Sequence, residues 1–173
     1  SQAMPTLEHL GLRVVEERPT RLLGGDGALW LQDFGVLGPT DHPLDLEECG
    51  DRVAQCIAAV WRGEAESDSL NRLIINAGLD WRRIAILRGY RKYRQRIGSR
   101  FTESYQNDVI AANSPITAKL VRYFELRFDP DIEPDEVVEA ELREEIMADL
   151  EEVSSIDHDR ILRNQLGAID ATL

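Results

Sequence analysis

The feature that most constrains the fold of this 173-residue chain is a change in hydrophobic period near residue 43. Residues 12–22 and 28–36 mix β-branched, apolar and charged side chains in the manner of half-buried strands. The stretch 38–43 holds one glycine and two prolines, which favour a loop. Beyond it, apolar residues recur every three or four positions, the spacing of amphipathic helices. The sequence therefore predicts a mainly α fold with an N-terminal β-hairpin.

The N-terminal unit, residues 4–40, is predicted to be a short helix followed by the hairpin. Gly11 suits the left-handed residue that ends a helix, and the stretch 24–27 holds three glycines, which suit a turn between strands. Because this stretch joins two strands and does not lead into a helix, a phosphate cradle is disfavoured. A two-stranded hairpin is marginally stable alone, so we expect it to belong to a larger sheet. Residues 1–3, ahead of Met4, resemble a tag remnant.

Residues 44–173 are predicted to form an antiparallel bundle of five or six amphipathic helices. The period, the N-cap residues and the glycine and proline breakers place candidate segments for these helices at residues 46–62, 68–77, 80–97, 102–112, 114–128, 134–150 and, from Ser154 or Ser155, up to residue 173. Asp80 and Thr102 are the expected N-caps of the third and fourth segments. In the third of these segments, the apolar line that we expect to face the core consists of Ile86, Tyr90, Tyr93 and Ile97.

Composition excludes several classes of partner. The chain carries 20 Lys and Arg against 32 Asp and Glu, a net charge of −12. Binding to nucleic acid without sequence preference, or to an anionic membrane surface, requires a basic surface, so neither partner is expected. Three histidines and two cysteines leave little material for a metal site, and no metal ligand is predicted. Cys49 and Cys56 are expected to be reduced, and without an apolar leader the chain is predicted to be cytoplasmic.

The charges are unevenly distributed along the chain. Residues 82–100 contain eight basic residues and no acidic one, a net charge of +8, whereas residues 129–152 contain twelve acidic residues and one basic residue, a net charge of −11. Two interpretations stay open: the segments are solvated helix faces that meet across the bundle, or the basic segment docks onto another domain or subunit. The candidate interdomain contact residues are Arg82, Arg83, Arg88, Arg91, Lys92, Arg94 and Arg96.

Candidates for acid–base or cofactor chemistry are few. Glu64, Glu66 and Asp68 are close together, but nothing in the sequence indicates a pocket around them, so we expect them in a solvated turn between two helices. No glycine-rich turn leads from a strand into a helix, as a dinucleotide site would need, and both lysines, Lys92 and Lys119, lie on predicted helices. No catalytic or cofactor-binding residue is therefore predicted in this chain.

Several strings, taken together and in this order, resemble the large bacterial NAD-specific glutamate dehydrogenases. The matching strings are LGLRVVEERP (10–19), WLQDFG (30–35), WRGEAESD (61–68), NRL (71–73), AGLDWR (77–82), FELRFDP (124–130), DRILR (159–163) and ATL (171–173). Ser69, Leu70 and the stretch 89–92 depart from the pattern of the family. The resemblance extends over nearly the whole chain. Because the hairpin lacks the other strands of a sheet and the last helical segment runs to Leu173, the chain is expected to be a piece of a longer one.

The resemblance implies an enzyme that converts L-glutamate, NAD and water into 2-oxoglutarate, ammonia and NADH. Residues 7–36 would be the end of an ACT-like ferredoxin fold, and residues 44–173 the helical region ahead of the catalytic part. The catalytic lysines and the nucleotide loop of the family have no counterpart here, so a non-catalytic regulatory or scaffolding role is implied. The implied partners are the catalytic region and neighbouring subunits of the same enzyme. Two alternatives stay open: a module that senses an amino-acid effector, and a free-standing helical protein-interaction domain.

Overall fold

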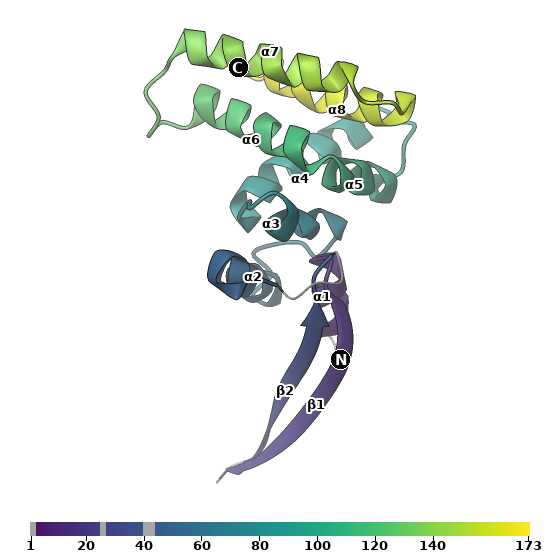
Figure 1. Cartoon of the computed structure of the whole chain (residues 1–173), viewed down its shortest axis with the longest axis vertical. Helices are drawn as coiled ribbons and strands as arrows, with labels where there is room; N and C mark the ends of the chain where they lie inside the picture. Colours follow the sequence, from purple (N-terminus) through teal and green to yellow (C-terminus); the bar gives the residue numbers. More distant parts are fainter. Residues whose placement is uncertain (1–2, 25–26, 40–43) are drawn as a thin grey trace.

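The computed structural model describes residues 3–24, 27–39 and 44–173. A two-stranded hairpin projects from one end of a stack of helices, and the C-terminus lies in the helical part, beside α7 (Figure 1). The predicted mainly α fold with an N-terminal antiparallel hairpin is confirmed. The predicted glycine turn includes residues 25–26 and the predicted loop includes residues 40–43, and these positions lie outside the described residues.

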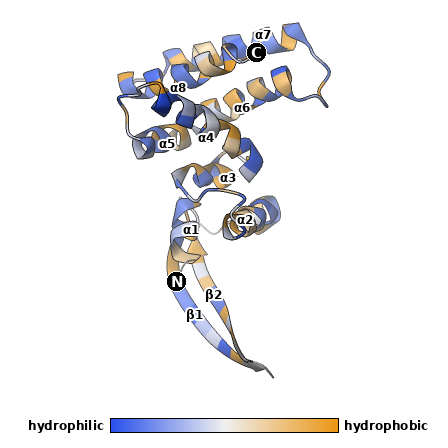
Figure 2. Cartoon of the chain, turned by 180° about the vertical axis from the view of Figure 1, so that it is seen from behind, coloured by the Kyte–Doolittle hydropathy of each residue, from blue (hydrophilic) through white to orange (hydrophobic). Residues whose placement is uncertain are grey.

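The N-terminal segment contains one helix and the hairpin. Helix α1 (Ala3–His9) is followed by Gly11, whose φ of +80° is the left-handed conformation predicted for a helix terminator. Strands β1 (Arg13–Gly24) and β2 (Gly27–Leu37) pair antiparallel, with a register irregularity between Val14 and Glu16. Pro19 is tolerated within β1 because a two-stranded sheet leaves one edge of each strand without a partner. Apolar residues lie along both strands (Figure 2), and Leu29, Trp30 and Leu31 are more than half exposed.

Seven α-helices and one 3-10 helix follow among the described residues. They are α2 (Leu46–Trp61), the 3-10 helix η1 (Ser69–Arg72), α3 (Leu73–Asn76), α4 (Trp81–Arg96), α5 (Glu103–Ala112), α6 (Ser114–Phe128), α7 (Glu136–Glu151) and α8 (Ile156–Asp170). The single helix predicted over residues 68–77 is instead divided into η1 and α3. The Asp68 side chain accepts a hydrogen bond from the Leu70 N–H, and the Asn71 amide donates to the Glu66 carbonyl at 3.1 Å, which tightens the first turn.

Side-chain caps set most helix starts. Asp80 accepts hydrogen bonds from the N–H groups of Arg82 and Arg83, Thr102 accepts one from Tyr105, and both caps agree with the sequence prediction. Asp45 and Asp135 cap α2 and α7 in the same way. These local interactions fix where the helices begin, but they do not determine which face of each helix is buried.

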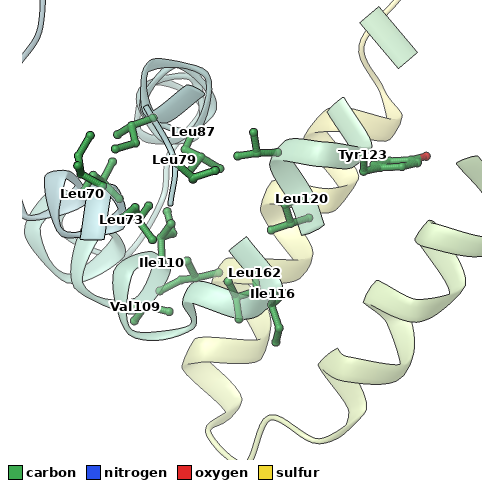
Figure 3. Close-up of a cluster of buried hydrophobic side chains, with 14 of the residues drawn as sticks. Leu70, Leu73, Leu79, Leu87, Val109, Ile110, Ile116, Leu120, Tyr123 and Leu162 are labelled. Atoms are coloured by element: carbon green, nitrogen blue, oxygen red, sulfur yellow. The ribbon is translucent and has the colours of Figure 1, made fainter. Parts of the chain in front are cut away.

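One hydrophobic core runs from α1 to α8. Figure 3 shows part of it, where leucines of η1, α3 and α4 gather with side chains of α5, α6 and α8. Helices α6 and α8 contribute buried residues to this core, among them Leu120, Leu162 and Ile169. In α7 the buried residues are Ile146 and Leu150, both in its second half.

The apolar line predicted to face the core in α4 is wrong. Tyr93 and Ile97 are 56% and 53% exposed, and Ile86 and Tyr90 are only half-buried. The buried side of the helix consists of Ile84, Leu87, Arg88 and Arg91. The physical reason is that both buried arginines meet carboxylates of neighbouring segments, so their burial is compensated by ion pairing.

The helices at the C-terminal end form a layer. Helix α6 packs against α7 and α8, and α4 packs against α5, α6 and α8 (Figure 1). No ion pair between described residues joins α4 to α7, so the basic and acidic segments do not pair directly with each other. None of the helices in the described part of the chain has the length and apolar character needed to cross a membrane.

Candidate functional site

The inner face of α4 holds a buried ion-pair network. Arg88, whose side chain is 5% exposed, donates Nε to Asp68 Oδ2 at 2.9 Å and Nη2 to Asp68 Oδ1 at 2.8 Å. The same Nη2 donates to Asn71 Oδ1 at 3.0 Å. A bidentate contact of this kind fixes the orientation of the guanidinium plane as well as its position. Asp68 therefore connects the segment before η1 to the middle of α4.

The pKa of Asp68 reflects this network. Burial by itself would raise the pKa of the carboxyl, but the hydrogen bonds and charge of Arg88, the Leu70 N–H and the charge of Arg91 outweigh burial. The pKa of Asp68 is consequently held below its ordinary value, and the group stays ionised at neutral pH. The expectation that Asp68 lies in a solvated turn is wrong, because Arg88 supplies a partner that local sequence does not indicate. Glu64 and Glu66 are exposed.

Arg91 lies one turn further along the same face and borders a polar pocket. Its side chain is 2% exposed, its Nη2 lies 3.7 Å from Asp68 Oδ2, and its Nη1 forms an ion pair with Glu103. Its Nε is buried and has no hydrogen-bond partner among the described residues. The pocket has a volume of about 630 Å³ and is lined by residues of α1, the 66–72 segment, α4 and α5.

The outer face of α4 borders a second, apolar groove. The groove has a volume of about 430 Å³ and lies between α4, α6 and α8. Its lining residues are small or aromatic: Ala85, Ile86, Gly89, Tyr90, Tyr93, Phe124, Ala168, Ala171 and Thr172. Three residues of the predicted apolar line, Ile86, Tyr90 and Tyr93, therefore line this groove. Small residues at Gly89 and Ala168 allow a second backbone to approach closely.

The seven basic residues predicted as interdomain contacts have different environments. The side chains of Arg88 and Arg91 are buried, and Lys92 forms an ion pair with Glu66. Arg83 donates Nε to Glu125 Oε1 of α6 at 2.6 Å. Within the described part of the chain, the members of the predicted set that form no ion pair are Arg82, Arg94 and Arg96. These three remain available for a contact outside the chain.

The acidic segment pairs with helices other than α4. Lys119 of α6 lies 2.8 Å from Asp149 and 3.3 Å from Glu145, and Arg163 of α8 lies 2.7 Å from Glu151. These contacts hold α7 against α6 and α8. The chain thus has a basic outer face on α4 and an acidic helix α7 that are separated by two other helices.

The two cysteines and Tyr123 are further potentially reactive groups among the described residues. Both cysteines are free thiols and both are buried, and burial raises the pKa of Cys56 to about 11 despite the nearby charge of Arg88. Burial and a hydrogen bond to Asp170 raise the pKa of Tyr123 to about 12. Neither group is ionised near neutral pH. Among the described residues, no group of three or more His, Cys, Asp and Glu side chains could hold a metal ion.

Sequence reasoning did not identify Asn71, Glu103 and Asn107 as members of a site, and it placed Asp68 in a solvated turn. Asp68 and Arg88 are twenty residues apart, and a single sequence carries no signal that pairs them. One indirect signal exists: Arg88 and Arg91 share a helix face with Leu87, and a charged pair on an apolar face requires partners.

Comparisons with known proteins agree with the resemblance seen in the sequence. Residues 1–49 match the model of the glutamate dehydrogenase ACT3 domain, and residues 65–130 match that of glutamate dehydrogenase helical motif 3. The whole chain is 38% identical to the NAD-specific glutamate dehydrogenase of Halomonas elongata and 35% and 31% identical to those of Pseudomonas aeruginosa and Mycobacterium tuberculosis.

All of this chain aligns with each of these relatives, but it spans only 11% of the length of each one. The two matched regions correspond to the hairpin segment and to η1 through α6. The chain therefore belongs to the NAD-specific glutamate dehydrogenase family, in which it represents an ACT3 region and helical motif 3.

Proposed function

We propose that this chain is a non-catalytic scaffolding and regulatory region of an NAD-dependent glutamate dehydrogenase. The whole protein would oxidise L-glutamate with NAD and water to 2-oxoglutarate, ammonia and NADH, at a catalytic region outside the chain. The names of the relatives and the small share of their length that aligns support this assignment. The separation of charges between α4 and α7 supports a role in assembly.

The observation that carries the proposal is the outer face of α4. Tyr93 is 56% exposed beside the apolar groove, and exposed aromatic surface of this kind is typical of protein contacts. Arg82 and Arg96, which have no ion pair within the described chain, lie on the same helix. We infer that the catalytic region or a neighbouring subunit of the same enzyme packs on this face, guided by the arginines.

The proposal also concerns the domain organisation of the chain and the cellular location of the protein. We propose that residues 4–40 are part of an ACT-like unit, whose sheet extends beyond the hairpin, and that residues 44–173 are the helical bundle. We expect the protein to work in the cytoplasm, because both cysteines are free thiols. NAD would bind in the catalytic region and not to this chain.

Two measurements test the assignment. The 173-residue chain, incubated with L-glutamate and NAD, should form no NADH detectable by its absorbance. In the whole enzyme, Tyr93→Ser should lower activity and promote dissociation, as measured by steady-state kinetics and analytical ultracentrifugation. The chain alone should melt at nearly the same temperature with and without this substitution, because Tyr93 is more than half exposed.

Val137→Ser is the matched control. Val137 is 66% exposed on α7, away from the groove, and its loss should leave assembly and activity unchanged. NADH formation by the chain itself would show that it is catalytic. Equal assembly and activity of the Tyr93→Ser and wild-type enzymes would exclude the α4 face as a contact. A chain that binds an unrelated protein and has no effect on the dehydrogenase would instead be a free-standing interaction domain.

A further inference from the structure

The groove on the outer face of α4 is lined mainly by apolar and aromatic side chains. It lies between α4, α6 and α8, which pack together in the C-terminal part of the chain (Figure 1). Two of its lining hydroxyl groups, those of Tyr90 and Thr172, lie 2.8 Å apart and are hydrogen-bonded to each other. The three walls are α-helices, whose backbone groups are paired internally. The groove therefore offers few hydrogen bonds to an occupant.

This lining restricts the backbone conformation of an occupant. A strand or an irregular segment carries N–H and C=O groups that need partners, and burying them against an apolar wall is unfavourable. An α-helix pairs its own backbone groups and presents only side chains. The side chains of α4 that line the groove recur at the spacing of ridges that pack against a second helix, at Ala85, Ile86, Gly89, Tyr90 and Tyr93. A helix is thus the conformation that fits the groove.

Gly89 lies in the middle of this face of α4. Glycine is unfavourable in the interior of a helix, and Gly89 does not have the positive φ that would require it. A Cβ atom built on Gly89 would meet no atom of another described segment within 4 Å. A larger side chain would therefore fit the fold of the described chain. The absence of a side chain instead leaves room for the backbone of a second helix to approach closely.

Two arginines flank the apolar part of this face. Arg82 precedes Gly89 by seven positions and Arg96 follows it by seven, so each lies two turns, or about 10.5 Å, along the axis on the same face. Both are exposed, and neither forms an ion pair within the described chain. Cζ of Arg82 lies 4.3 Å from the ring centroid of Trp81, a stacked contact that leaves its N–H groups available for a carboxylate. These charges favour an occupant that is acidic on both sides of its apolar centre.

The same arrangement disfavours a second copy of α4 as the occupant. In an antiparallel pair of α4 helices that meet at Gly89, Arg82 of each helix lies opposite Arg96 of the other, because both are seven positions from the centre. Like charges in these positions repel. The acidic helix α7 of the same chain is held elsewhere, because Lys119 of α6 and Arg163 of α8 pair with its carboxylates. The occupant therefore comes from outside the 173 residues.

We propose that the groove receives an amphipathic α-helix from another part of the dehydrogenase, with an apolar face and two acidic residues about 14 positions apart. The middle of the apolar face packs over Gly89, and the two carboxylates pair with Arg82 and Arg96. The inference rests on the docking role proposed above for the outer face of α4, and it specifies the chemistry of the partner that docks there.

Site-specific photo-cross-linking of the whole enzyme identifies the occupant. Tyr93→benzoylphenylalanine places a photoreactive ring at the groove, and mass spectrometry of the digested product gives the sequence to which it is joined. The expected partner is one segment outside residues 1–173, with apolar residues every three or four positions and two Asp or Glu residues about 14 positions apart. Val137→benzoylphenylalanine, at an exposed position of α7 away from the groove, is the control and should not join that segment.

Gly89→Leu tests the close approach of the second helix. In the 173-residue chain it should raise the melting temperature by about 2–4 °C, because leucine is the better helix former and no described segment crowds the position. In the whole enzyme it should lower the yield of the cross-link, because the added side chain fills the space of the partner backbone. A gain in stability together with a loss of cross-linking cannot result from unfolding.

Charge reversal tests the acidic flanks of the partner. Arg82→Glu/Arg96→Glu should lower the yield of the cross-link at least about twofold, since two exposed ion pairs are replaced by like-charge contacts. Raised salt should lower the yield for the wild-type enzyme, because exposed ion pairs are screened. Arg62→Glu is the matched control: Arg62 is an exposed arginine at the end of α2, which does not line the groove, and its reversal should leave the yield unchanged.

Several results would overturn the proposal. A cross-link to a segment that lacks the helical pattern or the acidic residues would do so, as would a cross-link to residues 1–173 of a second copy. A yield that neither Gly89→Leu nor the charge reversal changes would also overturn it. Each of these results leaves the docking role of the α4 face standing. The absence of any cross-link overturns the proposal as well, and Tyr93→Ser then decides whether the docking role fails with it.

Discussion

Removing the carboxylate of Asp68 should lower the free energy of unfolding more than truncation of any other polar side chain in the 66–72 segment. Asp68→Ala leaves Arg88, which is 5% exposed, with Asn71 as its remaining hydrogen-bond partner among the described residues. It also removes one of the two carboxylates beside Arg91. A buried guanidinium that loses its counterion cannot be rehydrated without opening the packing around α4.

The magnitude follows from two separate losses. Breaking a buried pair by removing one partner typically costs about 3–5 kcal/mol. Asp68 is itself 21% exposed, and Asn71 still accepts from Arg88, so we take the lower part of this range, about 3 kcal/mol. Asp68 also caps η1 by accepting from the Leu70 N–H, and loss of a cap costs about 1 kcal/mol. The expected total is about 4 kcal/mol.

Urea unfolding at neutral pH, followed by far-ultraviolet circular dichroism, measures this loss. Asp45→Ala is the matched control, because Asp45 caps α2 from an exposed position and has no buried ion pair, so its loss should cost only about 1 kcal/mol. The double variant Asp68→Ala/Arg88→Met should recover most of the lost stability, since no uncompensated charge remains on Arg88. A loss for Asp68→Ala no larger than that of the control, or a double variant as unstable as the single one, would refute the reasoning.

Three further outcomes are expected. Leu87→Ala should lower the free energy of unfolding by about 2–5 kcal/mol, as expected for a fully buried leucine, whereas Tyr93→Ser should change it by less than about 1 kcal/mol in the same urea assay. Stability should fall as the pH is lowered below about 4, because the pKa values of Asp68 and Asp170 are depressed in the folded chain and the unfolded chain therefore takes up protons first. Asp68→Asn should flatten this dependence in urea titrations at several pH values. The Cys56 thiol, with a pKa of about 11, should react with a disulfide reagent far more slowly in the folded chain than in denaturant, and equal rates would contradict its burial.

Local features of the sequence predicted the elements well. Asp80 and Thr102 were expected to cap helices and do so, and the glycine at position 11 has the positive φ expected of a terminator. Each of these signals acts within a few residues, so it is present in a single sequence. The change in hydrophobic period likewise separated the hairpin from the helices, because it depends only on which residues alternate.

Features that depend on distant partners could not be predicted. The basic segment was visible as a charge run, but the sequence does not indicate that Arg88 and Arg91 point inward while Arg82 points outward. Their partners Asp68 and Glu103 flank α4 on the two sides in sequence, and only folding brings them to the same helix face. The polar pocket was therefore not predicted, and Arg91, the residue of α4 that lines it, was instead expected at an interdomain contact.

Helix α4 also shows why hydrophobic period alone can assign a helix the wrong orientation. Ile84 and Leu87 lie on one side of α4, and Ile86 and Tyr93 lie on the other, so two rotations about the helix axis would each bury apolar area. Apolar burial is non-directional and cannot by itself decide between them. The contacts of Arg88 select one of these two rotations, because its bidentate hydrogen bonds to Asp68 form in only that rotation. The ion pairs thus bury the side of α4 that carries Ile84 and Leu87 together with the two arginines. This orientation leaves the aromatic side exposed along the groove, where we propose that another part of the enzyme packs.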